Sequence, residues 1–251
     1  MSGHSKWATI KHKKAATDAK RGRAFTKIIR EISIATRVGG ADPNSNPRLR
    51  TAILAAKNEN MPSDNIDRAI ARGAGTLEGE TYEEVSFEGY GPGGVGMIVQ
   101  VVTTNRNRIV SELRHIMNKN GGNMAETGAV GWMFQRKGDI VVAKEQANED
   151  KMLSIVLDAG AEDLRDDGEA WEVLTPPEAF EPVREALAKA GITPASAEVG
   201  WVPQNYVKLT GTQAGQMVRM IEALEEHDDV QKVSANFDID EKEMQAVMAE
   251  E

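Results

Sequence analysis

Residues 18–40 of the chain read DAKRGRAFTKIIREISIATRVGG, and this stretch decides the fold of the N-terminal part. Its apolar residues recur three or four positions apart: Phe25, Ile28, Ile29, Ile32 and Ala35. That spacing predicts an amphipathic helix with one buried stripe. Thr17 or Asp18 is a good N-cap for it, and the Gly39-Gly40 pair ends it.

Two shorter helices are predicted to follow. Asn46 and Pro47 are typical of an N-cap and the first helical position, and Pro62 opens the next helix. Gly73 stops that third helix, and residues 73–79 form a linker. We therefore expect a three-helix bundle over residues 15–73, within a basic helical nucleic-acid-binding domain at residues 1–75.

Beyond the linker, strand and helix patterns alternate. Strands are predicted at 85–90, 95–102 and 130–134, with a helix at 109–117. Residues 139–202 read as βαββαβ, the order of a ferredoxin-like unit. A βαβ segment follows at 206–237, and we expect a frayed acidic tail after it. The predicted class is α+β, with two ferredoxin-like domains after the helical one. One is discontinuous (76–136 and 204–251), and the other is inserted in it (137–203).

Charge is distributed unevenly along the chain. Residues 1–40 contain ten Lys or Arg and two acids, a net charge of +8, whereas the whole chain of 251 residues carries −9. The excess reaches +9 at residue 72, so residues 73–251 carry −18. This asymmetry indicates a polyanionic partner for the basic end.

The basic helix presents most of its charge opposite its apolar stripe, with Arg21 nearer the apolar side. A solvated face is the ordinary fate of such residues, but few acids lie near enough to pair with them. We expect this face to serve binding and not folding. The predicted nucleic-acid-binding residues are Lys6, Trp7, Lys11, Lys13, Lys14, Lys20, Arg21, Arg23, Lys27, Arg30 and Arg37.

A second contact region is predicted in the acidic body. Residues 89–94, GYGPGG, match a dinucleotide-binding pattern, but a strand follows them where that motif needs a helix. The alternatives are a close-approach loop for nucleic acid or protein and a plain connector. Asn105-Arg106-Asn107-Arg108 opens a helix, where Asn105 caps it or the arginines grip phosphate. The secondary candidates are Gly91, Gly93, Gly94, Arg106 and Arg108.

Several classes of protein are disfavoured. No nucleophile elbow, zinc-protease or Walker motif is present, so we expect no enzyme activity, no cofactor and no small-molecule substrate. The chain has no Cys, which excludes disulfides and thiolate metal sites, and no metal site is predicted. No apolar run approaches a membrane span, so a cytoplasmic protein without a membrane partner is expected.

The assembled motifs resemble the YebC family, described as transcriptional regulators. Thr104, where the family often has Asp, is one departure. The matching stretches are residues 3–7 (GHSKW), 18–22 (DAKRG), 25–31 (FTKIIRE), 46–50 (NPRLR), 88–94 (EGYGPGG), 105–108 (NRNR) and 121–123 (GGN).

The resemblance implies a three-domain protein and two competing functions. One is DNA-binding transcriptional regulation. The other is a ribosome-associated translation factor, related to a mitochondrial translational activator, that assists synthesis through proline-rich stretches. The partner is accordingly DNA or ribosomal RNA, with the ribosome included in the second case. A third interpretation, an acidic protein-interaction scaffold, leaves the basic arm unexplained.

Overall fold

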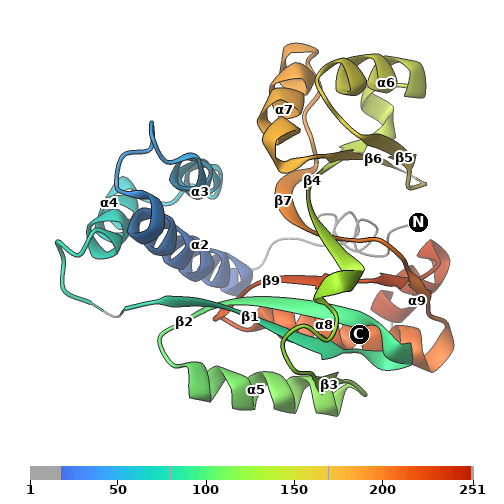
Figure 1. Cartoon of the computed structure of the whole chain (residues 1–251), viewed down its shortest axis with the longest axis horizontal. Coiled ribbons are helices and arrows are strands. Elements are labelled where there is room, and N and C mark those ends of the chain that lie inside the picture. Colours follow the sequence, from blue (N-terminus) through green and yellow to red (C-terminus); the bar gives the residue numbers. More distant parts are fainter. Residues whose placement is uncertain (1–17, 80, 169, 250–251) are drawn as a thin grey trace.

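The computed structural model describes residues 18–79, 81–168 and 170–249. Its buried side chains form three main clusters, one in the helical part, one beneath the central sheet and one in the inserted segment. Figure 1 shows the corresponding three parts around the central sheet. The predicted α+β class, with a helical start and two α+β units of which one is inserted, is confirmed.

The helical part consists of α2 (Asp18–Gly39), α3 (Pro47–Asn58) and α4 (Ser63–Gly73). Asn46 caps α3, because its Oδ1 accepts the Leu49 amide at 3.0 Å. Its Nδ2 donates to the Ala35 carbonyl at 2.8 Å and so joins the end of α2 to the start of α3. A Cβ at Gly73 would lie 2.4 Å from the Ser33 carbonyl oxygen, so a glycine is needed where α4 meets α2.

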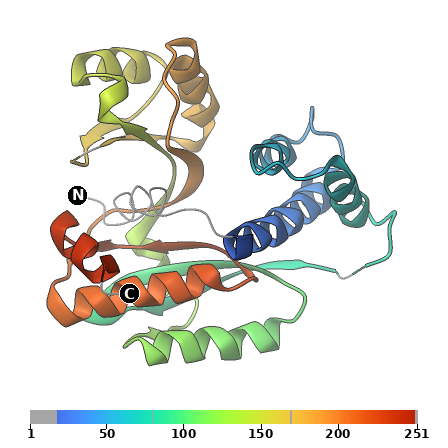
Figure 2. The same cartoon turned by 180° about the vertical axis from the view of Figure 1, so that it is seen from behind.

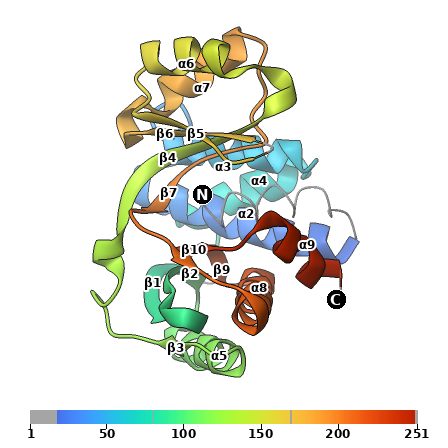
Figure 3. The same ribbon diagram turned by 90° about the vertical axis from the view of Figure 1, so that its right-hand side faces the viewer.

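The central sheet has the strand order β3-β1-β2-β9 and is antiparallel throughout. Its strands are β1 (Glu83–Tyr90), β2 (Gly96–Thr103), β3 (Asn123–Met124) and β9 (Val230–Ala235). Helices α5 (Arg106–Lys119) and α8 (Gly211–Glu226) cover one face, and α2 lies over the other (Figures 1 and 3). Pairing of β2 with β9 brings together segments on either side of the insertion.

The inserted unit comprises β4 (Phe134–Ala143), α6 (Glu149–Asp158), β5 (Asp163–Asp166), β6 (Ala170–Thr175), α7 (Phe180–Lys189) and β7 (Ser196–Pro203). Its sheet order, β5-β6-β4-β7, is that of a ferredoxin-like fold. Both helices pack on one face of this sheet (Figure 2). Short 3₁₀ turns occur at Pro92–Gly94, Gly131–Met133, Lys144–Gln146 and Pro177–Ala179.

Four sequence predictions differ from the structure. Residues 130–134 form a turn before β4, because Val130 and Phe134 bury themselves against the outer side of β2. Thr175 ends β6 instead of capping a helix. The strand β8 (Val207–Lys208) pairs in parallel with β10 (Phe237–Asp238) and does not join the central sheet. The tail is not frayed throughout, since α9 (Glu241–Ala249) buries Met244 fully in the central core.

Candidate nucleic-acid interface

The predicted binding residues fall into two groups. Lys6, Trp7, Lys11, Lys13 and Lys14 lie outside the described residues. The others belong to α2, where Lys20 and Arg21 are described by their backbone alone: Lys20, Arg21, Arg23, Lys27, Arg30 and Arg37.

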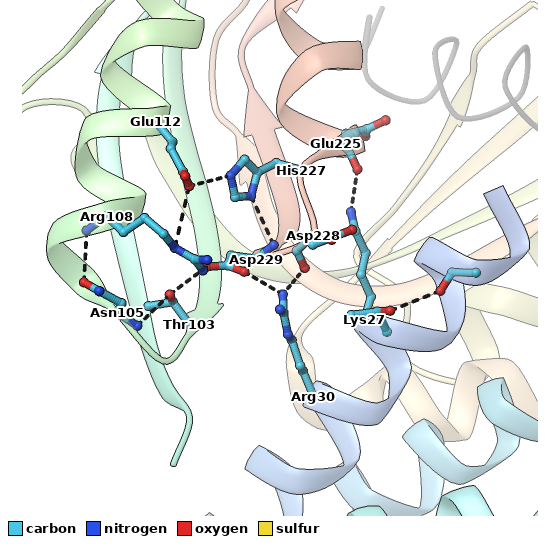
Figure 4. Close-up of polar contacts among 12 residues, drawn as sticks. Lys27, Arg30, Thr103, Asn105, Arg108, Glu112, Glu225, His227, Asp228 and Asp229 are labelled. Carbon is cyan, nitrogen blue, oxygen red and sulfur yellow. Dashed lines mark hydrogen bonds and ion pairs between the residues drawn. The ribbon is translucent and has the colours of Figure 1, made fainter. Parts of the chain in front are cut away.

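One side of α2 docks on the turn that joins α8 to β9. We refer to residues 225–229 of this segment, with the sequence EHDDV cut before its valine and preceded by Glu225, as the acidic turn. Arg23 Nη2 lies 3.1 Å from Glu226 Oε1, and Lys27 Nζ donates to the Glu225 carbonyl at 2.5 Å. Because Arg23 and Lys27 are four residues apart, they project from the same side of the helix (Figure 4).

Asp229 is the centre of this contact. Its side chain is only 2% exposed, and Arg30 Nη1 lies 2.8 Å from its Oδ1. Arg108 Nη2 and Thr103 Oγ1 donate to its Oδ2 at 2.6 and 2.7 Å. Burial alone would raise the pKa of Asp229, but the Thr103 hydrogen bond and the two guanidinium charges outweigh it and lower the pKa. Arg30 also donates to the Asp228 carbonyl.

The acidic turn is fixed on its other side by α5. The Asp229 amide donates to His227 Nδ1 at 3.1 Å, so the proton of a neutral ring lies on Nε2. That nitrogen is 2.9 Å from Glu112 Oε2, which it reaches as a donor. Asn105 caps α5 by accepting the Arg108 amide at 3.1 Å. The turn is thus held between α2 and α5 by groups from both (Figure 4).

The C-terminal half of α2 contacts the linker and β1. Arg37 Nη1 donates to the Tyr82 carbonyl at 2.7 Å, and the Arg30 guanidinium lies 5.7 Å from the Tyr82 ring centroid. Beside this contact a cleft of about 600 Å³ is lined by Arg37 and Arg72, among other residues. Arg48 adds a bridge between domains, with Glu31 on α2 and Glu84 on β1.

These contacts correct one prediction. The basic side of α2 was expected to have no role in folding, whereas Arg23, Lys27 and Arg30 all bind the acidic turn. The sequence search for compensating acids considered only neighbours along the helix. The partners come from about 200 residues away. A run of four acids in five residues at 225–229 was the signal that could have identified them.

The glycine-rich loop has a structural explanation at two of its three candidate positions. A Cβ at Gly91 would lie 2.9 Å from Met217 Sδ, and one at Gly93 would lie 2.5 Å from Leu209 Cδ2. Gly93 also has φ +69°. These glycines let the loop pack on α8 and β8. Gly94, with φ +81°, faces open space.

The two arginines of the second candidate region have different surroundings. Arg108 binds Asp229 and lies 3.9 Å from Glu112, although its side chain is 48% exposed. Arg106 is exposed and has no hydrogen bond or ion pair with another described residue. The structure therefore does not bring Arg106 to the cluster around Asp229.

Two other kinds of site were searched within residues 18–79, 81–168 and 170–249. No group of three or more His, Asp or Glu side chains in this part is arranged to hold a metal ion. No helix in the same part combines the length and apolar character that crossing a bilayer requires.

Comparison with known proteins gives consistent matches over the whole chain. Residues 5–76 match the model of the TACO1/YebC protein N-terminal domain, and residues 82–237 match that of the TACO1/YebC second and third domain. A "probable transcriptional regulatory protein" of Solibacter usitatus is 62% identical over 98% of this chain and 99% of its own length. One from Koribacter versatilis is 60% identical over the same shares. The crystal structure of a conserved hypothetical protein from Aquifex aeolicus is 47% identical, with a TM-score of 0.81 over 89% of this chain and 92% of that one.

Proposed function

Because this chain belongs to the TACO1/YebC family, we propose that it is a nucleic-acid-binding regulator of gene expression in the cytoplasm, a DNA-binding transcriptional regulator in the first instance. The observation that carries the proposal is the excess of ten bases over two acids in residues 1–40. The names of the relatives support the regulatory role. No catalytic step is part of the proposal.

The geometry divides the basic residues by task. Arg23, Lys27 and Arg30 dock the helical part on the acidic turn. We assign phosphate contacts to the bases that precede them, Lys6–Arg21, with Trp7 stacking on a base. Each phosphate neutralised releases counterions, so binding of this kind weakens steeply with salt.

RNA on the ribosome is the second candidate target. One observation favours it: the polar side of α2 lies against the acidic turn, so this helix is not free to enter a major groove as a recognition helix. Recognition by shape and backbone, which is usual for structured RNA, does not need such a helix.

The electrostatic test uses the full chain and two matched triple variants. Lys11→Gln, Lys13→Gln and Lys14→Gln remove three bases of the arm. Lys151→Gln, Lys189→Gln and Lys242→Gln remove three exposed bases from acidic helices and change the net charge equally.

Binding of a labelled mixed-sequence duplex DNA and of a labelled RNA hairpin is measured by fluorescence anisotropy from low to high salt. The arm variant should lower the slope of log K against log salt by about 0.9 per lost contact on duplex DNA. The control variant should keep the original slope. Equal slopes for all three proteins would refute the role of the arm.

The target is identified in cells. Ultraviolet crosslinking followed by recovery of the bound nucleic acid yields chromosomal DNA under the transcriptional proposal and ribosomal RNA under the translational one. Recovery of neither, together with no binding at low salt, would leave the protein-interaction scaffold as the better interpretation.

A further inference from the structure

We infer that the outer face of α5 is a second nucleic-acid-binding surface, which contacts the phosphate backbone separately from the N-terminal part. The inference rests on the proposed function and adds to it a site in the acidic body. The outer face is defined by six exposed residues of this helix: Arg106, Asn107, Arg114, His115, Asn118 and Lys119.

The charge of α5 is opposite to that of the body around it. Residues 73–251 contain 15 Lys or Arg and 33 Asp or Glu. Four of those bases but only one of those acids, Glu112, belong to α5. Glu112 is itself compensated, since it contacts His227 at 2.9 Å and Arg108 at 3.9 Å. The outer face therefore presents positive charge without an uncompensated carboxylate on the same helix.

The three bases of the outer face are available for a ligand. Arg106, Arg114 and Lys119 are exposed, and none has a hydrogen bond or ion pair with another described residue. This distinguishes them from Arg23, Lys27 and Arg30, which bind the acidic turn. Folding gives the α5 bases no partner, while their mutual repulsion is relieved by an anion.

The neutral residues of the outer face fit the same ligand. Asn107 and Asn118 supply amide donors between the bases, and phosphate or sugar contacts in nucleic-acid complexes come from Arg, Lys and such neutral donors. From Arg106 to Lys119 the helix rises ~20 Å, at 1.5 Å per residue. This length matches about six nucleotides of one strand, at about 3.4 Å each.

The position of α5 allows an extended ligand to approach. Its buried side, formed by Ile109, Leu113 and Met117, packs on the central sheet. The helix lies on the opposite face of that sheet from α2 and on the far side of the molecule from the inserted unit (Figures 1 and 3). Neither part stands over the outer face. We commit to nucleic acid as the occupant, because complementary charge is the property that this surface offers.

The test compares the full chain with a variant carrying Arg106→Gln, Arg114→Gln and Lys119→Gln. The control is the triple variant Lys151→Gln, Lys189→Gln and Lys242→Gln, which changes the net charge equally. Binding of a labelled RNA hairpin and of a labelled duplex DNA is measured across a salt series. A charge-retaining variant, Arg106→Lys with Arg114→Lys, checks that charge and not helix stability is responsible.

Each lost phosphate contact lowers the salt slope by about 0.7 to 0.9, a factor of about 5 to 8 in affinity at 0.1 M salt. The α5 variant should therefore bind about a hundredfold more weakly, while its thermal midpoint and the binding of the other two variants stay unchanged. If the unaltered chain binds and the α5 variant matches it in affinity and slope, this inference is wrong and the proposed function stands. If the unaltered chain binds neither probe at low salt, both fail.

Discussion

Replacing Arg30 by Gln should destabilise the protein, because it removes one partner of a buried carboxylate. Asp229 is 2% exposed and Arg30 14% exposed at the side chain, so water cannot readily replace the lost ion pair. Truncating one partner of a buried pair costs about 3–5 kcal/mol when the other is left alone. Here Arg108 and Thr103 continue to bind Asp229. We therefore expect a smaller loss of about 2–3 kcal/mol, the contribution of a hydrogen bond to a charged group.

The assay is urea unfolding of a double-mutant cycle, with Arg30→Gln, Asp229→Asn and the double variant. The coupling energy between the two positions should fall within the usual range of about 0.5–3 kcal/mol for residues in contact. Lys57→Gln on α3 is the control, since Lys57 is exposed and should change stability by less than about 0.5 kcal/mol.

An unchanged or increased stability of Arg30→Gln, as expected if α2 suffers mainly from repulsion between its own bases, would refute this reasoning. The basic side of α2 would then have to be regarded as a binding surface that folding does not use.

Two further predictions concern the inserted unit. Burial and neighbouring carboxylates raise the pKa of Asp139 from 3.8 to about 8, so the folded state keeps a proton that the unfolded chain releases. Stability should therefore fall between about pH 4 and pH 8, by up to about 1.4 kcal/mol per pH unit, and Asp139→Asn should flatten the profile in urea titrations. Gly138→Ala should cost about 1–3 kcal/mol, because its Cβ would lie 2.3 Å from Thr175 Oγ1. A thermal midpoint equal to that of the unaltered chain would show that the strand shifts freely there.

Local sequence determined the elements whose signals act over a few residues. Asn46, Asn105 and Asn148 all cap helices as side-chain acceptors for amides three residues ahead, and this geometry is complete within one turn. The spacing of Phe25, Ile28 and Ile32 likewise fixed which side of α2 is buried. Such features depend on backbone geometry alone and do not need the rest of the chain.

Only the tertiary structure decided what lies opposite those elements. The sequence showed that Arg30 faces away from the apolar stripe, but its partner Asp229 is 199 positions away along the chain, and no periodicity relates the two. Val130 was predicted to start a strand, and its burial against Ile98 of β2 instead places it in a turn. Long-range pairing depends on how sheets and helices stack, so the same basic stripe can dock on an acidic turn or remain open to nucleic acid.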